Sequence, residues 1–178
     1  MLLDTIEIVS TLIVNPPESV SLIIPVYNEP SGISQTLNSL AELNHSSSKL
    51  VVDNASTDNT RDIIQNYAND HDNVHLLIED GIQGSYAARN KGIQHAEGDV
   101  LAFLDADETV DENWLETALE AMDTQDVDYL GCNVELTLPE DTLIGRYNAR
   151  TGFPVKQYLN EEHYAPTCAL LVRRDVFK

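Results

Sequence analysis

The stretch Gly98-Asp-Val-Leu-Ala-Phe-Leu-Asp-Ala-Asp107 constrains the fold of this chain more than any other segment. Its apolar part, Val100 to Leu104, is unbroken and ends abruptly in Asp105-Ala-Asp107. A short apolar run between polar residues is typical of a strand that is buried on both faces of a parallel sheet. The two carboxylates would then lie at the carboxyl end of that strand, where open α/β sheets bind their ligands.

Asp105 and Asp107 are two residues apart, so on an extended segment their side chains point to the same side. They can therefore converge on one cation, or on a cation and a sugar hydroxyl. Carboxylate oxygens suit Mg²⁺ or Mn²⁺, and Mg²⁺ usually completes its coordination shell with water and substrate phosphates. The alternative is an acidic turn in a very acidic protein, and this short motif alone does not separate the two.

Predicted strands and helices alternate through the first two thirds of the chain. We expect strands over residues 20–26, 50–53, 74–78 and 100–104, and helices over residues 31–40, 60–68, 85–95 and 112–122, with serine N-caps at Ser31 and Ser85. Short right-handed crossovers of this kind produce a parallel sheet. Three strands would end in polar residues on the same edge: Tyr27-Asn28-Glu29, Asp53 and the Asp105/Asp107 pair.

The pattern changes beyond Asp126. We predict a strand over 129–138, an irregular segment over 139–166 and a last apolar strand over 167–173. Residues 1–19 end in Asn15-Pro16-Pro17 and are interpreted as an N-terminal extension. The prediction is therefore one α/β domain over 20–178, with a first half over 20–126 and the start of a second half over 127–178.

Charge excludes one class of partner. The chain has 30 acidic and 10 basic residues, for a net charge of −20, whereas nucleic-acid binding needs a basic footprint. The acidic residues are scattered among apolar segments, and this composition with few lysines suggests the surface of a halophile. Cys132 and Cys168 have no metal-type spacing, which favours a reducing cytosol. Neither a signal peptide nor an apolar run of membrane-spanning length is found in the sequence.

Four blocks of the sequence resemble the family 2 glycosyltransferases of the GT-A fold, in order and spacing. They are Ser21-Leu-Ile-Ile-Pro-Val-Tyr-Asn-Glu29, Val51-Val-Asp-Asn-Ala-Ser-Thr-Asp-Asn-Thr60, Ala87-Ala-Arg-Asn-Lys-Gly92 and Ala102-Phe-Leu-Asp-Ala-Asp107. A later segment, 169–177, is similar but less specific. The resemblance implies a Rossmann-like, mostly parallel sheet flanked by helices. It also implies transfer of a sugar from a nucleoside-diphosphate sugar to an acceptor hydroxyl, with inversion and with a divalent metal.

The resemblance further implies a role for each matching residue. Pro25, Tyr27 and Glu29 would border the nucleoside, and Tyr27 could stack on the base. Asp53 would accept a hydrogen bond from the base or ribose, and Arg89 would face the nucleotide or its diphosphate. Asp105 would contact the ribose or the metal, and Asp107 would hold Mg²⁺ or Mn²⁺.

Two of these residues have simpler interpretations. Asp53 could instead cap the turn after its strand, and Arg89 could form an ion pair on a helix surface, which contributes little. Asp58 and Asp99 also match family positions, but we interpret them as turn and strand-start residues.

No catalytic base is assigned within the chain. The resemblance places that Asp or Glu downstream of segment 169–177, so we expect it after Lys178 and expect the chain to be truncated at its C-terminus. Four carboxylates in the second half lack the family's context: Glu140, Asp141, Glu161 and Glu162.

Two other functional classes are alternatives to a glycosyltransferase. A sugar nucleotidyltransferase would be expected to open on a Gly-rich phosphate loop, and Pro25-Val-Tyr-Asn-Glu29 has no glycine. A non-catalytic nucleotide-sugar-binding module remains open because no base is evident. For a glycosyltransferase, the resemblance implies a saccharide, lipid-linked or protein-linked acceptor in polysaccharide or glycoprotein biosynthesis. It would work in the cytoplasm or at the cytoplasmic face of a membrane, associating with the membrane only through downstream sequence or a lipid acceptor.

Overall fold

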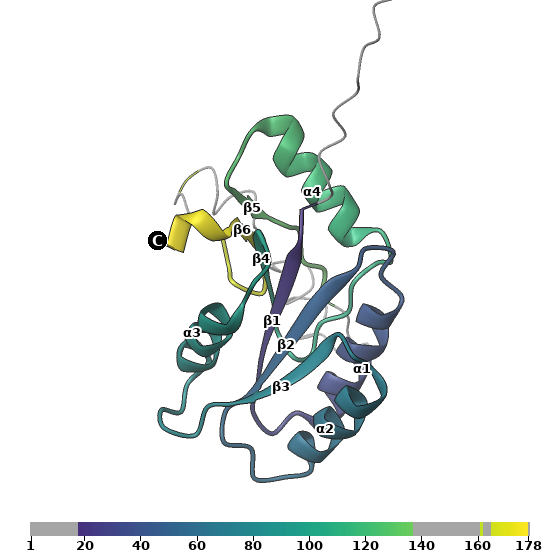
Figure 1. Cartoon of the computed structure of the whole chain (residues 1–178), viewed down its shortest axis with the longest axis vertical. Helices are drawn as coiled ribbons and strands as arrows, with labels where there is room; N and C mark the ends of the chain where they lie inside the picture. The colour runs from purple at the N-terminus through teal and green to yellow at the C-terminus, as the bar shows by residue number, and fades with distance from the viewer. Residues whose placement is uncertain (1–17, 137–160, 162–164, 178) are drawn as a thin grey trace, which may run out of the picture.

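The computed structural model describes residues 18–136, 161 and 165–177. Its sheet has the strand order β3-β2-β1-β4-β6-β5 (Figure 1). The strands are β1 (Val20–Val26), β2 (Ser47–Asp53), β3 (Val74–Ile78), β4 (Val100–Leu104), β5 (Tyr129–Gly131) and β6 (Ala169–Arg173). The first four are parallel, β6 runs antiparallel to β4, and β5 runs antiparallel to β6. The predicted α/β fold with a mostly parallel sheet is confirmed.

Helices cover both faces of the sheet (Figure 1). They are α1 (Pro30–Ala41), α2 (Thr60–Asp70), α3 (Ser85–His95) and α4 (Trp114–Gln125), and a 3₁₀ turn, η2 (Arg174–Phe177), follows β6. The larger hydrophobic cluster joins one face of the sheet to α1, α2 and α4, and α3 packs on the opposite face against β1 and β2. Because both faces are covered, β1 and β4 are buried along their whole length, as their apolar runs predict.

Two predicted helix caps were wrong. Helix α1 begins at Pro30, and its N-cap is Glu29, whose Oε1 accepts a hydrogen bond from the Gly32 N–H at 3.1 Å. Pro30 suits the first helical position because an N–H there would have no helical partner, so Ser31 lies inside the first turn. Helix α3 begins at Ser85, and its N-cap is Gly84, with no side-chain hydrogen bond.

Strand β2 is longer than expected and β5 is shorter in the described residues. Strand β2 begins at Ser47, because pairing with β1 extends it through polar residues that the apolar pattern could not include. Strand β5 ends at Gly131, and residues 137–138 of the predicted strand lie outside the described part. No helix among the described residues is both long and apolar enough to cross a bilayer.

Two glycines allow helices to approach the sheet and the turn after β4 closely. A Cβ on Gly32 would lie 2.7 Å from the carbonyl oxygen of Ala106, so glycine lets the start of α1 touch the turn after β4. A Cβ on Gly92 would lie 2.5 Å from Cγ2 of Ile23, so glycine lets α3 lie directly on β1.

Candidate functional site at the carboxyl edge of the sheet

The predicted polar residues meet at one edge of the sheet. Strand β1 lies between β2 and β4, and all three run in the same direction, so Tyr27, Asp53 and Asp105 follow neighbouring strand ends. Tyr27 is 48% exposed, whereas Pro25 is buried within β1. The structure therefore supplies an exposed aromatic ring beside a cluster of carboxylates.

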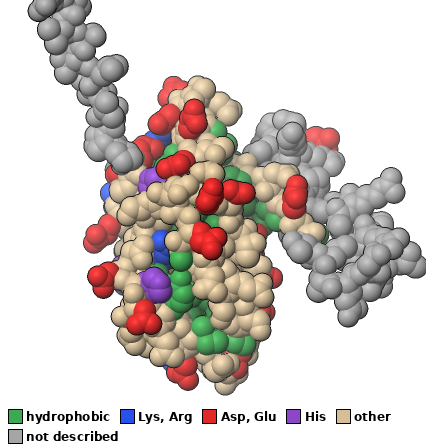
Figure 2. All heavy atoms as spheres, turned by 90° about the vertical axis from the view of Figure 1, so that its right-hand side faces the viewer, with side chains coloured by type: hydrophobic (Ala, Val, Ile, Leu, Met, Phe, Trp, Pro, Cys, Tyr) green, Lys and Arg blue, Asp and Glu red, His purple; other side chains and the backbone are tan. Residues whose placement is uncertain are grey.

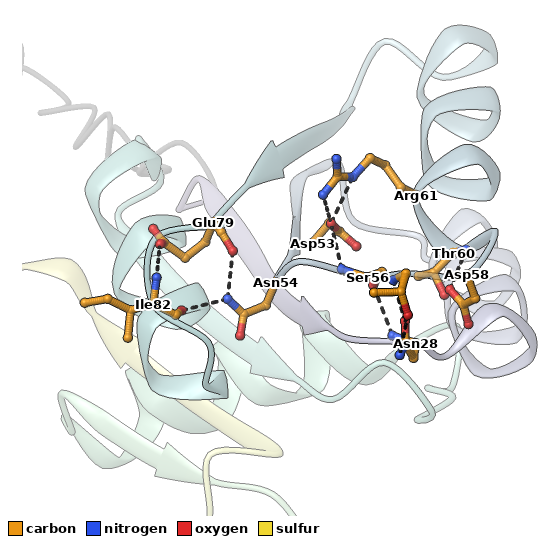
Figure 3. A network of polar contacts seen from close by, with 10 residues as sticks. Asn28, Asp53, Asn54, Ser56, Asp58, Thr60, Arg61, Glu79 and Ile82 are labelled. Atoms are coloured by element: carbon orange, nitrogen blue, oxygen red, sulfur yellow. Dashed lines mark hydrogen bonds and ion pairs between the residues drawn. The ribbon is translucent and has the colours of Figure 1, made fainter.

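The loops after β1 and β2 are joined by Asn28 (Figure 3). Its backbone N–H donates to Ser56 Oγ at 3.0 Å, and its Oδ1 accepts from the Thr57 N–H at 2.8 Å. The backbone of Asn28 has a φ of 50°, a conformation that asparagine tolerates better than most residues. The two loops are thus held as one unit around the end of β2.

Asp53 is fully buried and only half of its carboxylate is engaged. Its Oδ2 accepts hydrogen bonds from Arg61 Nη2 at 2.6 Å, from Arg61 Nε at 3.0 Å and from the Ser56 N–H at 3.3 Å. Its Oδ1 is buried with no partner in the described residues. Asp53 therefore caps the turn, as its simpler interpretation has it, and its Oδ1 has unused acceptor capacity. Arg61 was missed, because nothing in the sequence pairs it with Asp53.

Asn54 ties the end of β2 to the loop that leads into α3 (Figure 3). Its Nδ2 donates to the carbonyl oxygens of Glu79 at 2.8 Å and Ile82 at 2.9 Å, and its Oδ1 accepts from the Gly84 N–H at 2.5 Å. Asn54 is 3% exposed. This contact fixes the start of α3, the helix that carries Arg89.

Arg89 and Asp105, which the family resemblance assigns to the nucleotide and its metal, contact each other. Arg89 Nη2 lies 2.5 Å from Asp105 Oδ1, an ion pair between α3 and the end of β4. Arg89 is 15% exposed at its side chain, and its Nε is buried without a partner in the described residues. The pair therefore bridges two elements across the site, unlike the exposed helix-surface pair that was the simpler interpretation.

Glu108, which is not among the predicted site residues, closes the turn after β4. Its Oε2 accepts a hydrogen bond from the Asp105 N–H at 2.8 Å. Burial raises the pKa of Glu108 to about 7, and the nearby charges of Asp105 and Asp107 also raise it. Burial likewise raises the pKa of the adjacent Cys168 thiol to about 11. The acidic residue three positions after Asp105 is a sequence signal that could have predicted the hydrogen bond between Glu108 and the turn.

The carboxylate pair fits a divalent ion that relies on substrate for further ligands. Asp107 is exposed, and Asp105 is partly exposed beside Arg89. The described residues contain no group of three or more His, Cys, Asp and Glu side chains that could hold a metal ion. Two carboxylates on one turn with open space beside them match the coordination of Mg²⁺, which usually keeps sites for water and phosphate.

A groove of about 630 Å³ opens beside the turn, on the side of α4 and β5. Its wall includes Asp105, Asp107, Glu108, Trp114, the segment 133–136 and Cys168. Trp114 is partly buried and packs against the hydrophobic core, with part of its surface in the groove. An aromatic ring among polar groups suits a sugar ring, which has both apolar faces and hydroxyls.

The remaining carboxylates separate into two groups. Asp58 Oδ1 accepts from the Thr60 N–H at 2.9 Å, and Asp99 Oδ2 accepts from Ser19 Oγ at 2.7 Å. Their predicted roles at a turn and a strand start are confirmed. Glu140, Asp141 and Glu162 lie outside the described residues, while Glu161 is exposed.

The curated relatives that match this chain in sequence are glycosyltransferases. The chain is 43% identical to Glycosyltransferase AglE of Haloferax volcanii over 161 residues, which are 88% of this chain and 53% of the relative. This match supports the halophilic origin suggested by composition. The chain is 38% identical to the glycosyltransferase TuaG of Bacillus subtilis over 104 residues, which are 58% of this chain and 41% of the relative. The chain thus spans about half the length of the curated relatives that it matches.

Solved structures share the fold. The mannosyltransferase PcManGT from Pyrobaculum calidifontis, in complex with GDP-Man and Mn²⁺, superposes with a TM-score of 0.70 at 23% identity, over 92% of this chain and 46% of the other. Staphylococcus aureus TarS 1–349, in complex with UDP-GlcNAc, superposes with a TM-score of 0.62 at 26% identity, over 89% and 46%. The domain therefore has the GT-A glycosyltransferase fold. Residues 21–178 match the sequence model of glycosyl transferase family 2, and the chain belongs to that family.

Proposed function

We propose that this chain is the donor-binding part of an inverting glycosyltransferase that uses a nucleoside-diphosphate sugar and Mg²⁺ or Mn²⁺. The observation that carries the proposal is that Asp53, Asp105 and Asp107 follow the carboxyl ends of parallel strands at one sheet edge, where Arg89 contacts Asp105. Residues 20–126 would bind the nucleotide sugar, and residues 127–178 would begin the acceptor half.

The nucleoside would lie over the ends of β1 and β2. Oδ1 of Asp53 has no partner among the described residues and is an acceptor only, so it would suit an N–H of the base or a hydroxyl of the ribose. UDP and GDP-Man are present in complexes of structures that share this fold. The exposed ring of Tyr27 would stack on the base, with Pro25 and Glu29 at the border.

The diphosphate would lie between Arg89 and the turn after β4. Asp105 and Asp107 would hold the divalent ion, and Arg89 would exchange its contact with Asp105 for a charge-assisted hydrogen bond to phosphate. A bound divalent ion stabilises the negative charge that develops on the leaving diphosphate. Glu108 would keep the turn in place through its hydrogen bond to the Asp105 N–H.

The acceptor would approach through the groove beside Trp114, on the side of the sugar away from the diphosphate. Its hydroxyl attacks the anomeric carbon while a general base takes the proton. We infer, from the family resemblance, that this base lies beyond Lys178. We also infer a saccharide, lipid-linked or protein-linked acceptor, and a reaction in the cytoplasm or at the cytoplasmic face of a membrane.

Thermal unfolding with a panel of UDP and GDP sugars, with and without Mn²⁺, tests the donor site. We expect one donor to raise the melting temperature, and Mn²⁺ to increase that shift. Release of free nucleoside diphosphate from the labelled donor then separates an enzyme from a non-catalytic binding module. If no nucleotide sugar changes the melting temperature at saturating concentration, the proposed donor site is wrong.

A further inference from the structure

A second cavity lies near the opposite edge of the sheet from the carboxylate site. It has a volume of about 380 Å³ and lies between α1, α2 and the amino ends of β2 and β3. Its apolar wall consists of Leu37, Leu40, Ala41, Leu43, Tyr67 and Val74, and its polar wall of Asn44, His45, Ser46, Lys49, His71 and Asn73.

The lining of this cavity reverses the charge balance of the chain. None of its residues is acidic, although the chain has 30 acidic residues, and it contains one lysine and two of the five histidines. By contrast, the groove beside Trp114 is lined by Asp105, Asp107, Glu108, Asp111 and Glu135. On the side of the molecule that carries α1 and α2, Figure 2 shows basic and histidine side chains beside a strip of apolar ones, with acidic side chains around them. Such a cavity favours an anion over a cation.

Lys49 is the central group of this cavity. It lies on β2, where Ser47, Lys49 and Val51 alternate toward the α1 and α2 layer, and it is 5% exposed. Its Nζ donates one hydrogen bond, to the carbonyl oxygen of Ser47 at 3.3 Å. None of the carboxylates in the described residues forms an ion pair with it. A buried ammonium without a counter-ion is unfavourable, and burial lowers the pKa of Lys49.

Some of the polar atoms around Lys49 have unused hydrogen-bonding capacity, and others are held in place by contacts. Nδ1 of His45 and Oγ of Ser47 are buried and have no partner among the described residues. His71 is fixed by stacking on Tyr67, with ring centroids 4.0 Å apart, and its Nδ1 lies 2.9 Å from the Tyr67 carbonyl oxygen. Asn73 directs one amide N–H to the Ser47 carbonyl oxygen at 3.2 Å. The lysine therefore lies in a partly preformed, donor-rich environment.

We propose that this cavity binds a small organic anion, with a phosphate or carboxylate head group against Lys49 and an apolar part against Ala41 and Leu43. The head group would supply the counter-ion that no described residue provides, and the apolar wall accounts for an organic ligand in preference to a bare ion. The site is separate from the proposed donor site. Lys49 and Asp53 are four residues apart on β2, which corresponds to about 13 Å along a strand. The proposal does not depend on the proposed function.

Binding of phenyl phosphate, followed by ¹H–¹⁵N NMR at constant ionic strength without divalent cations, tests the proposal. We expect chemical-shift changes concentrated at residues 43–49 and 71–74. Inorganic phosphate should bind about tenfold more weakly because it lacks the apolar part, and neutral benzyl alcohol should not bind. Phenylacetate carries a carboxylate on a similar ring, so its affinity relative to phenyl phosphate identifies the preferred head group.

Two variants locate the site. K49M keeps an unbranched side chain that is one atom shorter, removes its charge and should lower the affinity for phenyl phosphate at least tenfold. K91M, which removes the other described lysine from α3 and from its contact with Glu79, is the matched control and should bind as wild type does. S46D places a negative charge at the exposed rim and should also weaken binding, and it decides the question if K49M does not fold. Three results would each overturn the proposal. They are wild-type affinity for phenyl phosphate in the deciding variant, chemical-shift changes centred on Arg89, and no binding of phenyl phosphate by the wild-type chain.

Discussion

Arg89 of α3 and Asp105 at the end of β4 form an ion pair across the carboxyl edge of the sheet, with 2.5 Å between Nη2 and Oδ1. The arginine is mostly buried, whereas the carboxylate is 42% exposed. A diphosphate would compete for the guanidinium, and a cation would compete for the carboxylate. The ion pair therefore stabilises the ligand-free site and has to open when the proposed ligands bind.

The first prediction follows from this pair. R89A should weaken the binding of UDP or GDP about tenfold or more, because a hydrogen bond to a charged group contributes roughly 1.5–3 kcal/mol. The affinity for the corresponding nucleoside, which lacks phosphate, should change little. Calorimetric titration with both ligands makes the comparison, and R89K should recover part of the loss. Equal losses for nucleoside and diphosphate would mean that Arg89 supports the fold of the site and does not contact phosphate.

The second prediction concerns the metal. D107A should abolish the increase in nucleoside diphosphate affinity that Mn²⁺ produces, while the metal-free affinity and the circular dichroism spectrum persist. Asp107 is exposed on the turn, so its replacement leaves the core unchanged. D111A, on the same groove, is a control that should keep the metal effect. An unchanged Mn²⁺ effect in D107A would exclude Asp107 as a metal ligand.

The third prediction concerns the nucleoside. D53A should weaken nucleotide binding by about tenfold or more, equally with and without metal, because Oδ1, which has no partner among the described residues, is proposed to bind the nucleoside. R61M removes the partner on the other oxygen of Asp53 and should cause a smaller loss through misplacement of the carboxylate. Affinities from fluorescence or calorimetry are compared after both variants are shown to fold. A loss for D53A that appears only with Mn²⁺ would instead place Asp53 among the metal ligands.

The fourth prediction is a pH dependence from Glu108. Folding raises the pKa of Glu108 from 4.5 to about 7, so the folded state binds more protons than the unfolded state between these values. The free energy of unfolding should therefore fall as pH rises through this window. Without divalent cations, E108Q should gain stability relative to wild type between about pH 5 and about pH 8. E120Q on the exposed face of α4 is the control, and a parallel pH profile for wild type and E108Q would contradict the assigned shift.

The fold could be predicted from the sequence because its signals are local. The run from Val100 to Leu104 needed two buried faces, and the alternation of strands and helices restricted the connections to right-handed crossovers. The placement of Asp53 and Asp105 on one edge followed from those two facts. The N-cap residues of α1 and α3 were predicted wrongly, because Ser31 and Ser85 are good caps by type, whereas Glu29 and Gly84 occupy the cap positions.

The contacts within the site could not be predicted in the same way. The pairing of Asp53 with Arg61 and of Arg89 with Asp105 depends on how α2 and α3 pack on the sheet, which no pattern in the chain encodes. The same holds for the cavity around Lys49, since the apolar pattern gave only the strand 50–53 and left Lys49 outside it. Side chains from separate elements meet there only after the helices are docked.

The last prediction concerns the general base. The 178-residue chain should bind a nucleoside diphosphate and a divalent ion but transfer sugar slowly, because the proposed base lies beyond Lys178. Without it the acceptor hydroxyl must lose its proton to water, and a positioned base typically contributes about 10²–10⁴-fold. Single-turnover transfer to a matched acceptor should therefore be slower by that factor than in a longer form that extends to the length of the relatives.

The D107A variant of both forms controls for donor binding, since it should slow transfer in each. Slow hydrolysis of the donor can persist in the shorter form, because the leaving diphosphate is still stabilised there. Equal transfer rates in the two forms would place the base within residues 1–178. The carboxylates to replace first would then be Glu108 and Glu135 in the groove, followed by Glu140, Asp141, Glu161 and Glu162.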